Sequence, residues 1–251
     1  MSEIRETWGR YASAFAAEGT AAEDRESIRR LVELCALPSG SLVLDVATGA
    51  GYTAFAFART GCRVIPSDPT HEMLLATKVG WRERGLDGEA KCVEAWAEAL
   101  PFLGASLDAV VSHRAPHQFA DVDAFASEAR RVLNARGVLA IADQSPPDGY
   151  ETCHNDLERM RDPTHEHARS PREWRAVFEG AGLKIRSTDV VYQYHDVEEW
   201  FDRVDCPPDR REAALEMLEA IPDEIRDVYR PETVDGRLKM RTPQCVVVAS
   251  I

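Results

Sequence analysis

The chain has 251 residues, of which 44% are hydrophobic and 29% charged, a balance typical of a globular protein with one substantial core. Its formal charge of −13 disfavours a nucleic-acid partner, because an acidic surface repels the phosphate backbone. The sequence shows no apolar run long enough to span a bilayer, no secretory pattern at its start and no closely spaced cysteines of the kind that bind zinc. We therefore expect a cytoplasmic protein without a structural metal.

The first 145 residues alternate between helical and strand-like segments. Residues 22–35 carry apolar side chains at helical spacing, and Thr20 followed by Glu23 has the pattern of a capping box. The segments after this helix are predicted as strand 41–46, helix 52–59, strand 62–68, helix 70–84, strand 91–94, strand 107–112, helix 122–133 and strand 137–143. Strands that alternate with helices of this length predict parallel βαβ units in a doubly wound sheet.

After residue 143 this alternation breaks off. Residues 144–170 are polar and carry three histidines, and Ser170 followed by Glu173 has the spacing of a helix start. The remaining segments are predicted as helix 171–181, strand 183–194, two helical stretches within 196–229 and strand 244–250. The whole chain, 1–251, is therefore predicted to be a single domain, in which residues 144–230 include a cap.

The segment VLDVATGAGYTAFAFA, residues 43–58, joins a buried strand to a helix through a turn that contains Gly49 and Gly51. Glycine lets the backbone approach a ligand closely, and a helix N-terminus favours negative charge. The second strand ends at Asp68, where a carboxylate is placed to accept hydrogen bonds from ribose hydroxyls. Together these features predict a nucleoside-containing cofactor, a property that nicotinamide and adenosylmethionine enzymes share.

With three further segments in the same order, this motif resembles the class I S-adenosylmethionine-dependent methyltransferases, in particular the ubiquinone/menaquinone C-methyltransferase-like group. The further segments are AEALPF at 97–102, LDAVVSHRAPHQF at 107–119 and RVLNARGVLAIAD at 131–143. The resemblance covers roughly residues 5–190. It implies an α/β fold, with a Rossmann-like, seven-stranded, mostly parallel sheet, helices on both faces and a small helical cap. It also implies S-adenosyl-L-methionine as cofactor and S-adenosyl-L-homocysteine as product, but it does not specify the acceptor.

The resemblance carries a cofactor site over to this sequence residue by residue. The residues that it places against the cofactor are Tyr11, Asp45, Ala47, Gly49, Gly51, Asp68, Trp96, Ala97 and His113. Tyr11 belongs to an N-terminal helix within residues 1–20, which in similar enzymes folds over the cofactor as a lid; a packing stripe with Trp8 and Phe15 is the alternative. Trp96 stands where the family has an aspartate that accepts from the adenine amine. An indole can stack on adenine but cannot accept that hydrogen bond.

A methyltransferase needs a base only where the acceptor must lose a proton, and histidine titrates in the suitable range. His117, after the fourth strand, is our first candidate for that base or for orienting the acceptor; a hydrogen bond at a helix start is the alternative. His165 is the second candidate. It lies in the segment RDPTH, residues 161–165, which resembles a stretch in some members of the family, and a solvated loop histidine is the alternative. Asp143, which ends the fifth strand, either faces the acceptor cavity or caps the next turn.

The sequence thus predicts methyl transfer to a carbon, oxygen or nitrogen atom of a small, partly apolar molecule. Two alternatives stay open. One is a protein of the same fold that binds adenosylmethionine without transferring its methyl group, as a cyclase or a binding protein. The other is a nicotinamide-dependent oxidoreductase. A homodimer is compatible with the sequence.

Overall fold

The structure is a computed structural model that describes residues 2–17 and 25–251, so the predicted capping box of Thr20 and Glu23 lies outside the described residues. The strands are β1 (Leu42–Val46), β2 (Arg63–Asp68), β3 (Val93–Glu94), β4 (Leu107–His113), β5 (Leu133–Gln144), β6 (Lys184–Asp196), β7 (Glu232–Val234) and β8 (Arg237–Ser250). The helices are α1 (Ser2–Ala16), α3 (Glu26–Cys35), α4 (Tyr52–Arg59), α5 (His71–Glu83), the 3-10 turn η1 (Pro116–Gln118), α6 (Val122–Val132), α7 (Glu151–Arg161), α8 (Pro171–Gly180), α9 (Val197–Asp202), α10 (Pro208–Glu219) and α11 (Asp223–Tyr229). None of these described helices is long and apolar enough to cross a membrane.

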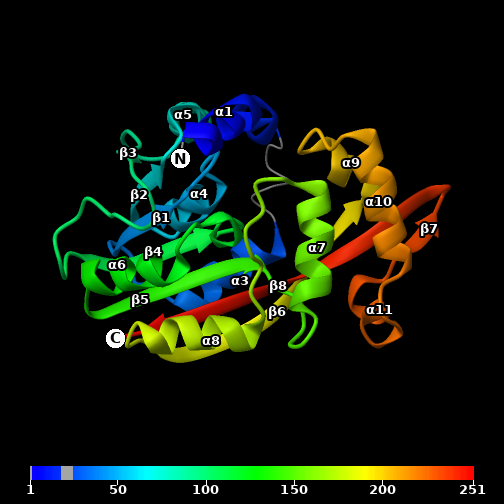
Figure 1. Ribbon diagram of the computed structural model, residues 1–251. Coiled ribbons are helices and arrows are strands. Elements are labelled where there is room, and N and C mark those ends of the chain that lie inside the picture. The colour runs from blue at the N-terminus through cyan, green and yellow to red at the C-terminus, as the bar shows by residue number, and fades with distance from the viewer. Residues whose placement is uncertain (1, 18–24) are drawn as a thin grey trace.

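One sheet organises the described residues, with the strand order β3-β2-β1-β4-β5-β8-β6 (Figure 1). Strands β1 to β5 are parallel, whereas β8 runs antiparallel to both β5 and β6. The Rossmann-like, mostly parallel sheet is thereby confirmed. An eighth strand, β7, is added to the seven expected because it forms a hairpin with the start of β8. The hairpin turn consists of Asp235 and Gly236, both at positive φ, as a tight two-residue turn requires.

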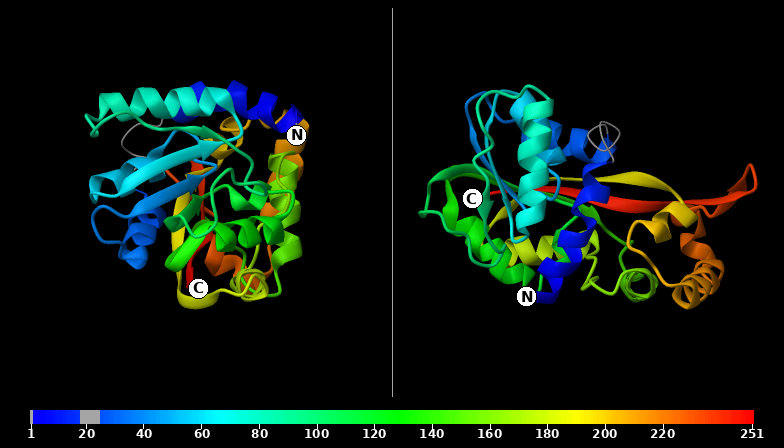
Figure 2. Two further views of the ribbon diagram at one scale, coloured as in Figure 1. Left: turned by 90° about the vertical axis from the view of Figure 1, so that its left-hand side faces the viewer. Right: turned by 90° about the horizontal axis from the view of Figure 1, so that it is seen from above.

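Helices cover both faces of the sheet, because successive strand residues point to opposite sides (Figure 2). On one face Val43 packs in an apolar cluster with Phe55 and other side chains from α3 and α4. On the other face the neighbouring residue Leu44 packs with Phe125 of α6 and Trp174 of α8. Strands buried on both faces explain why β1, β4 and β5 are nearly continuous apolar runs.

Strands β6 and β8 extend beyond the rest of the sheet as a two-stranded ribbon, and helices gather at its far end (Figure 1). A third apolar cluster lies among these helices. Strand β5 ends opposite Gln244, whereas β6 and β8 remain paired from there to Asp196 and Lys239. The helices α7, α9, α10 and α11 gather around this ribbon and bury Leu157, Trp200 and Tyr229. These four helices form the cap of the molecule.

One prediction for the cap region is wrong, because residues 196–229 form three helices rather than two. Residues 151–161 form helix α7, which is not among the predicted helices. Most of the residues that α7 buries are polar, so the apolar periodicity that reveals a helix is missing. The helix start at Ser170 is confirmed, because Ser170 and Glu173 form a complete capping box.

Candidate functional site

The turn after β1 has an unusual backbone. Ala47, Gly49 and Gly51 all have positive φ, at 55°, 56° and 93°. A left-handed conformation costs an alanine roughly 1–2 kcal/mol, and strain of this kind concentrates at ligand sites. The backbone N–H of Thr48 donates to the carbonyl oxygen of Ser67 at 2.8 Å, which ties the turn to the end of β2. The turn is therefore held in place at the carboxyl edge of the sheet.

The two glycines of this turn have different surroundings. A Cβ atom added to Gly49 would have no neighbouring atom within 4 Å. A Cβ atom added to Gly51 would lie 2.6 Å from Phe55 and 2.8 Å from Thr77. Gly49 thus borders open space in which a ligand can approach the backbone, whereas Gly51 is needed for close packing of the turn on α4 and α5.

Two buried carboxylates flank the turn. Asp45 accepts a hydrogen bond from Thr48 Oγ1 at 2.6 Å, while its Oδ1 atom has no hydrogen-bond partner among the described residues. Asp68 accepts from the backbone N–H groups of Gly49 and Thr70, both at 2.9 Å. Burial, only partly offset by these hydrogen bonds, raises the pKa of Asp45 to about 7 and that of Asp68 to about 6. A buried acceptor without a partner is what a ligand donor would satisfy.

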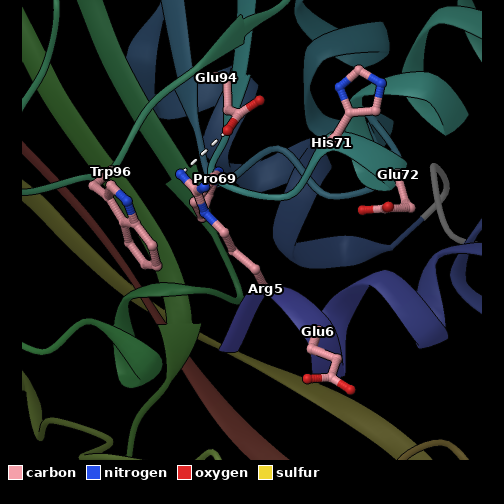
Figure 3. Close-up of a pocket in the computed structure, with 7 residues that line it drawn as sticks. All are labelled: Arg5, Glu6, Pro69, His71, Glu72, Glu94 and Trp96. Carbon is pink, nitrogen blue, oxygen red and sulfur yellow. Dashed lines mark ion pairs between the residues drawn. The ribbon is translucent and has the colours of Figure 1, made fainter. Parts of the chain in front are cut away.

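A pocket of about 590 Å³ opens beside the end of β2 (Figure 3). Its lining residues are Arg5, Glu6, Pro69, His71, Glu72, Glu94 and Trp96. The guanidinium of Arg5 lies 5.3 Å from the centre of the Trp96 ring and 3.2 Å from Glu94. Ala97, the next residue, is buried in an apolar cluster with Val46. The structure thus places Trp96, but not the side chain of Ala97, at an open pocket.

Helix α1 lies across this edge of the sheet and reaches the cap (Figure 2). The hydroxyl of Tyr11 donates to the carbonyl oxygen of Val204, next to α9, at 3.0 Å. The hydroxyl of Tyr52, in the first turn of α4, lies 2.8 Å and 3.0 Å from the carbonyl oxygens of Phe15 and Ala16. The ring of Trp8 packs edge-on against both Tyr11 and Phe15. Tyr11 therefore joins α1 to the cap in this structure, and Trp8 and Phe15 form the packing stripe.

His113 ends β4 and faces α3. Its Nε2 atom lies 2.9 Å from the hydroxyl of Ser27. Desolvation of the ring and the positive charge of Arg114 lower the pKa of His113 well below its ordinary value, so the ring is neutral. Arg114 itself has a positive φ of 52°. Another strained residue thus stands at the same edge of the sheet as the glycine turn.

His117 and Asp143 form a buried pair at the ends of β4 and β5. The Nδ1 atom of His117 lies 2.7 Å from Asp143 Oδ1. Asp143 also accepts from the backbone N–H groups of His117 at 2.6 Å and Gln144 at 2.9 Å, so it acts as the acceptor and Nδ1 is the donor. The Nε2 atom of His117 then carries a lone pair and has no partner among the described residues. The alternative of a hydrogen bond at a helix start is observed, because the backbone N–H of His117 in η1 donates to Asp143, whereas a role as base stays a prediction.

His165 stacks on His117, with ring centres 5.5 Å apart. Its Nε2 atom lies 2.6 Å from Asn155 Oδ1, which is an acceptor, so Nε2 carries the proton. Its Nδ1 atom lies 3.3 Å from the amide nitrogen of Gln144 and accepts there. Burial, followed by repulsion from His117, lowers the pKa of His165 to about 2. His165 is therefore a buried neutral ring with both nitrogens occupied, and it is not a solvated loop residue.

Helix α7 contributes a polar layer, in which Glu158 was not among the candidate residues of the sequence. His154 Nδ1 lies 2.7 Å from the hydroxyl of Tyr229, and its Nε2 atom is buried without a partner among the described residues. Glu158 pairs with Arg161 at 2.8 Å, and Arg161 lies over the ring of Trp200. Burial alone would raise the pKa of Glu158. The opposing effect of Arg161 and two histidines is larger, so the pKa is lowered to about 2. The spacing of residues 154, 158 and 161 is helical, and this polar periodicity was the available signal.

Comparisons with known proteins agree with this arrangement. A family model described as a methyltransferase domain matches residues 44–141. The uncharacterized methyltransferase YcgJ of Bacillus subtilis strain 168 is 32% identical over 192 residues, which cover 74% of each chain. The demethylmenaquinone methyltransferase of Thermus thermophilus is 34% identical over 121 residues, 47% of this chain and 54% of that protein.

Solved structures show the same fold. The crystal structure of YcgJ superposes with a TM-score of 0.82 at 26% identity, over 89% of this chain and 97% of that chain. A geranyl diphosphate C-methyltransferase from Streptomyces coelicolor, solved with S-adenosyl-L-homocysteine, shares the fold alone, with a TM-score of 0.60 at 15% identity over 89% and 78% of the two chains. YcgJ matches in both sequence and structure over most of its length. The chain therefore belongs to the class I methyltransferase family.

Proposed function

We propose that this methyltransferase uses S-adenosyl-L-methionine and transfers the methyl group to a small, partly apolar molecule that must lose a proton. The observation that carries the proposal is the buried His117–Asp143 pair, which stands at the same sheet edge as the glycine turn. Strands β1 and β4 are parallel neighbours, so the turn after β1 and the 3-10 turn after β4 lie at their shared carboxyl edge. The candidate base would therefore lie at the same edge as the proposed nucleoside site.

The residues at the glycine turn fit such a cofactor. The open space over Gly49 admits a ligand against the backbone, and the unpartnered Oδ1 atom of Asp45 is a buried acceptor for a donor group. Asp68 would hold the ribose hydroxyls while it keeps Gly49 in place. His113 would line the methionine half of the site. When bound, the sulfonium supplies an electrophilic methyl group, and its positive charge would favour the ionised forms of Asp45 and Asp68, whose pKa values burial raises.

His117 would take the proton of the acceptor at Nε2. Asp143 fixes the ring with Nδ1 as donor, which leaves the Nε2 lone pair for the acceptor, and its negative charge stabilises the imidazolium that forms. A base of this kind typically contributes 10²- to 10⁴-fold in rate. His165 would position His117 by stacking, because its own nitrogens are both occupied. This role replaces the direct catalytic role that the sequence suggested for His165.

The acceptor is expected to be small and partly apolar because the chain resembles the ubiquinone/menaquinone C-methyltransferase-like group. Such an acceptor would combine a hydrophobic body with an ionisable hydroxyl or an acidic C–H group.

The test is production of S-adenosyl-L-homocysteine from S-adenosyl-L-methionine in the presence of a panel of phenols, hydroxyquinones and other small hydroxylated molecules. With an acceptor found in this way, His117→Gln should lower kcat by about 10²-fold or more. The control is His167→Gln, because His167 lies in the same segment but is bonded to Glu173. An unchanged kcat in His117→Gln, with cofactor affinity intact, would remove His117 from the chemistry. Tight cofactor binding without any product across the panel would favour the non-methylating alternative.

A further inference from the structure

The pocket beside β2 lacks the carboxylate that the family uses to recognise adenine. That position is Trp96, whose indole has an N–H donor and no acceptor. We propose that the cofactor base is held by stacking on Trp96 and by the guanidinium of Arg5 from α1, so that this site binds purines with little discrimination at the 6-position. This inference rests on the proposed cofactor.

Two side chains in the pocket, Trp96 and Arg5, can each pack against a flat aromatic ring, and they face each other (Figure 3). The guanidinium of Arg5 lies 5.3 Å from the centre of the Trp96 ring, a cation–π distance. Glu94 binds the same guanidinium at 3.2 Å and steers it toward the indole. Arg5 and Glu94 are both about half exposed, at 44% and 45% of their side-chain surface, so their ion pair serves orientation more than stability.

The spacing between Arg5 and Trp96 couples the base to the lid. A flat ring between two groups needs about 3.5 Å on each side, or about 7 Å in all. The present distance is 5.3 Å, so entry of a base between the two groups requires the guanidinium of Arg5 to move away from the indole. Because Arg5 belongs to α1, this helix becomes part of the proposed cofactor site.

Recognition by stacking differs from recognition by hydrogen bonds in what it excludes. A site built to hydrogen-bond a substrate group strongly rejects an analogue without it, whereas stacking on an aromatic ring tolerates every base because each has a π-face. Among the carboxylates that line the pocket, Glu6, Glu72 and Glu94, the one on the same segment as Trp96 is Glu94, and it is paired with Arg5. The inosine analogue, with an oxygen in place of the amine, should therefore bind nearly as well.

The experiment is calorimetric titration with S-adenosyl-L-homocysteine and with S-inosyl-L-homocysteine. We expect the two affinities of the wild-type protein to differ by less than about fivefold. Trp96→Leu should weaken both ligands about tenfold, since stacking of a base on an aromatic ring accounts for a change of that size. Arg5→Met should weaken both by about threefold. Arg10→Met, a change in an exposed arginine of the same helix outside the pocket, should change neither.

The reverse substitution gives the sharpest contrast. Trp96→Asp restores the family carboxylate and should create a preference of at least tenfold for the adenine ligand. Strong discrimination by the wild-type protein that disappears in Glu94→Gln would overturn the inference, because Glu94 would then read the amine. Unchanged affinity in Trp96→Leu would also overturn it. If neither ligand binds the wild-type protein, the proposed cofactor itself fails, which is a separate and distinguishable result.

Discussion

Gly49 and Gly51 stand two positions apart in one turn, yet the structure requires them for different reasons. Both have positive φ, so any side chain at either position is strained. Only at Gly51 would a Cβ atom also collide with neighbours, at 2.6 Å from Phe55. The space over Gly49 is open, and we propose that the ligand occupies it.

These differences predict opposite phenotypes for two similar variants. Gly51→Ala should lower the melting temperature by several degrees, because the steric clash adds to backbone strain of about 1 kcal/mol or more. Gly49→Ala should lose only the strain contribution, yet it should weaken S-adenosyl-L-homocysteine at least tenfold by occupying the approach to the backbone. Thermal melts and calorimetry on both variants decide the matter. Gly49→Ala with full affinity would show that the turn does not face the ligand.

Individual residues of the candidate site could be proposed from the sequence where a motif fixes them. Asp45, Asp68 and the glycine turn follow from a strand–turn–helix pattern, and His117 follows from its place after the fourth strand. Arg5 could not be predicted, because its contact with Trp96 depends on how α1 crosses the sheet edge. The pairing of His117 with Asp143 was equally hidden, since the sequence allowed Asp143 to cap a turn instead.

At the scale of elements, buried strands were easier to predict than the helices of the cap. Strands β1, β4 and β5 are covered on both faces and therefore appear as continuous apolar runs. Helix α7 buries a polar layer, with Glu158 satisfied by Arg161 and Asn155 by backbone groups, so hydrophobic periodicity gives no sign of it. The first half of β8 was missed for a related reason: only its second half lies in the main sheet.

Helix α1 is fastened to the rest of the molecule by tyrosine hydroxyls at separate points. Tyr11→Phe removes the hydrogen bond to Val204 and should destabilise the closed position of α1 by about 1 kcal/mol, while the fold remains intact. Hydrogen exchange of the α1 amides should accelerate about fivefold, measured by mass spectrometry. Tyr194→Phe is the control, because that tyrosine is 70% exposed. Equal exchange in Tyr11→Phe and the wild type would show that α1 is held by its apolar contacts alone.

At the scale of the whole molecule, several neutral histidines make stability depend on pH. Desolvation lowers the pKa of His113, His154, His165 and His195. In the unfolded chain these rings bind protons below about pH 6.5, whereas His154 and His165 in the fold resist protonation down to about 4 and about 2. Each such histidine removes about 1.4 kcal/mol of stability per pH unit below that point.

Asp45 and Asp68 act in the opposite direction. Their pKa values are raised in the fold, so their contribution is fully present below about pH 4 and is lost as pH rises through about 6 to 7. As pH falls, the stability lost through the four histidines exceeds the stability gained through the two aspartates. We therefore expect the free energy of unfolding to fall as pH is lowered from 6.5 to 5. Urea denaturation across this range measures the slope, which should be shallower in His165→Asn than in His167→Gln. A flat or rising profile would contradict the neutral state assigned to these rings.

We infer that one sheet edge holds both the methyl donor and His117, the proposed general base. A crystal structure with S-adenosyl-L-homocysteine tests it most directly. We predict that the adenine ring lies against Trp96 and that the ribose hydroxyls bind Asp68. The amino-acid half should lie beside the Gly49 turn, and the sulfur atom should face His117 Nε2. A ligand bound elsewhere, or a nucleoside at this edge whose sulfur points away from His117, would contradict it.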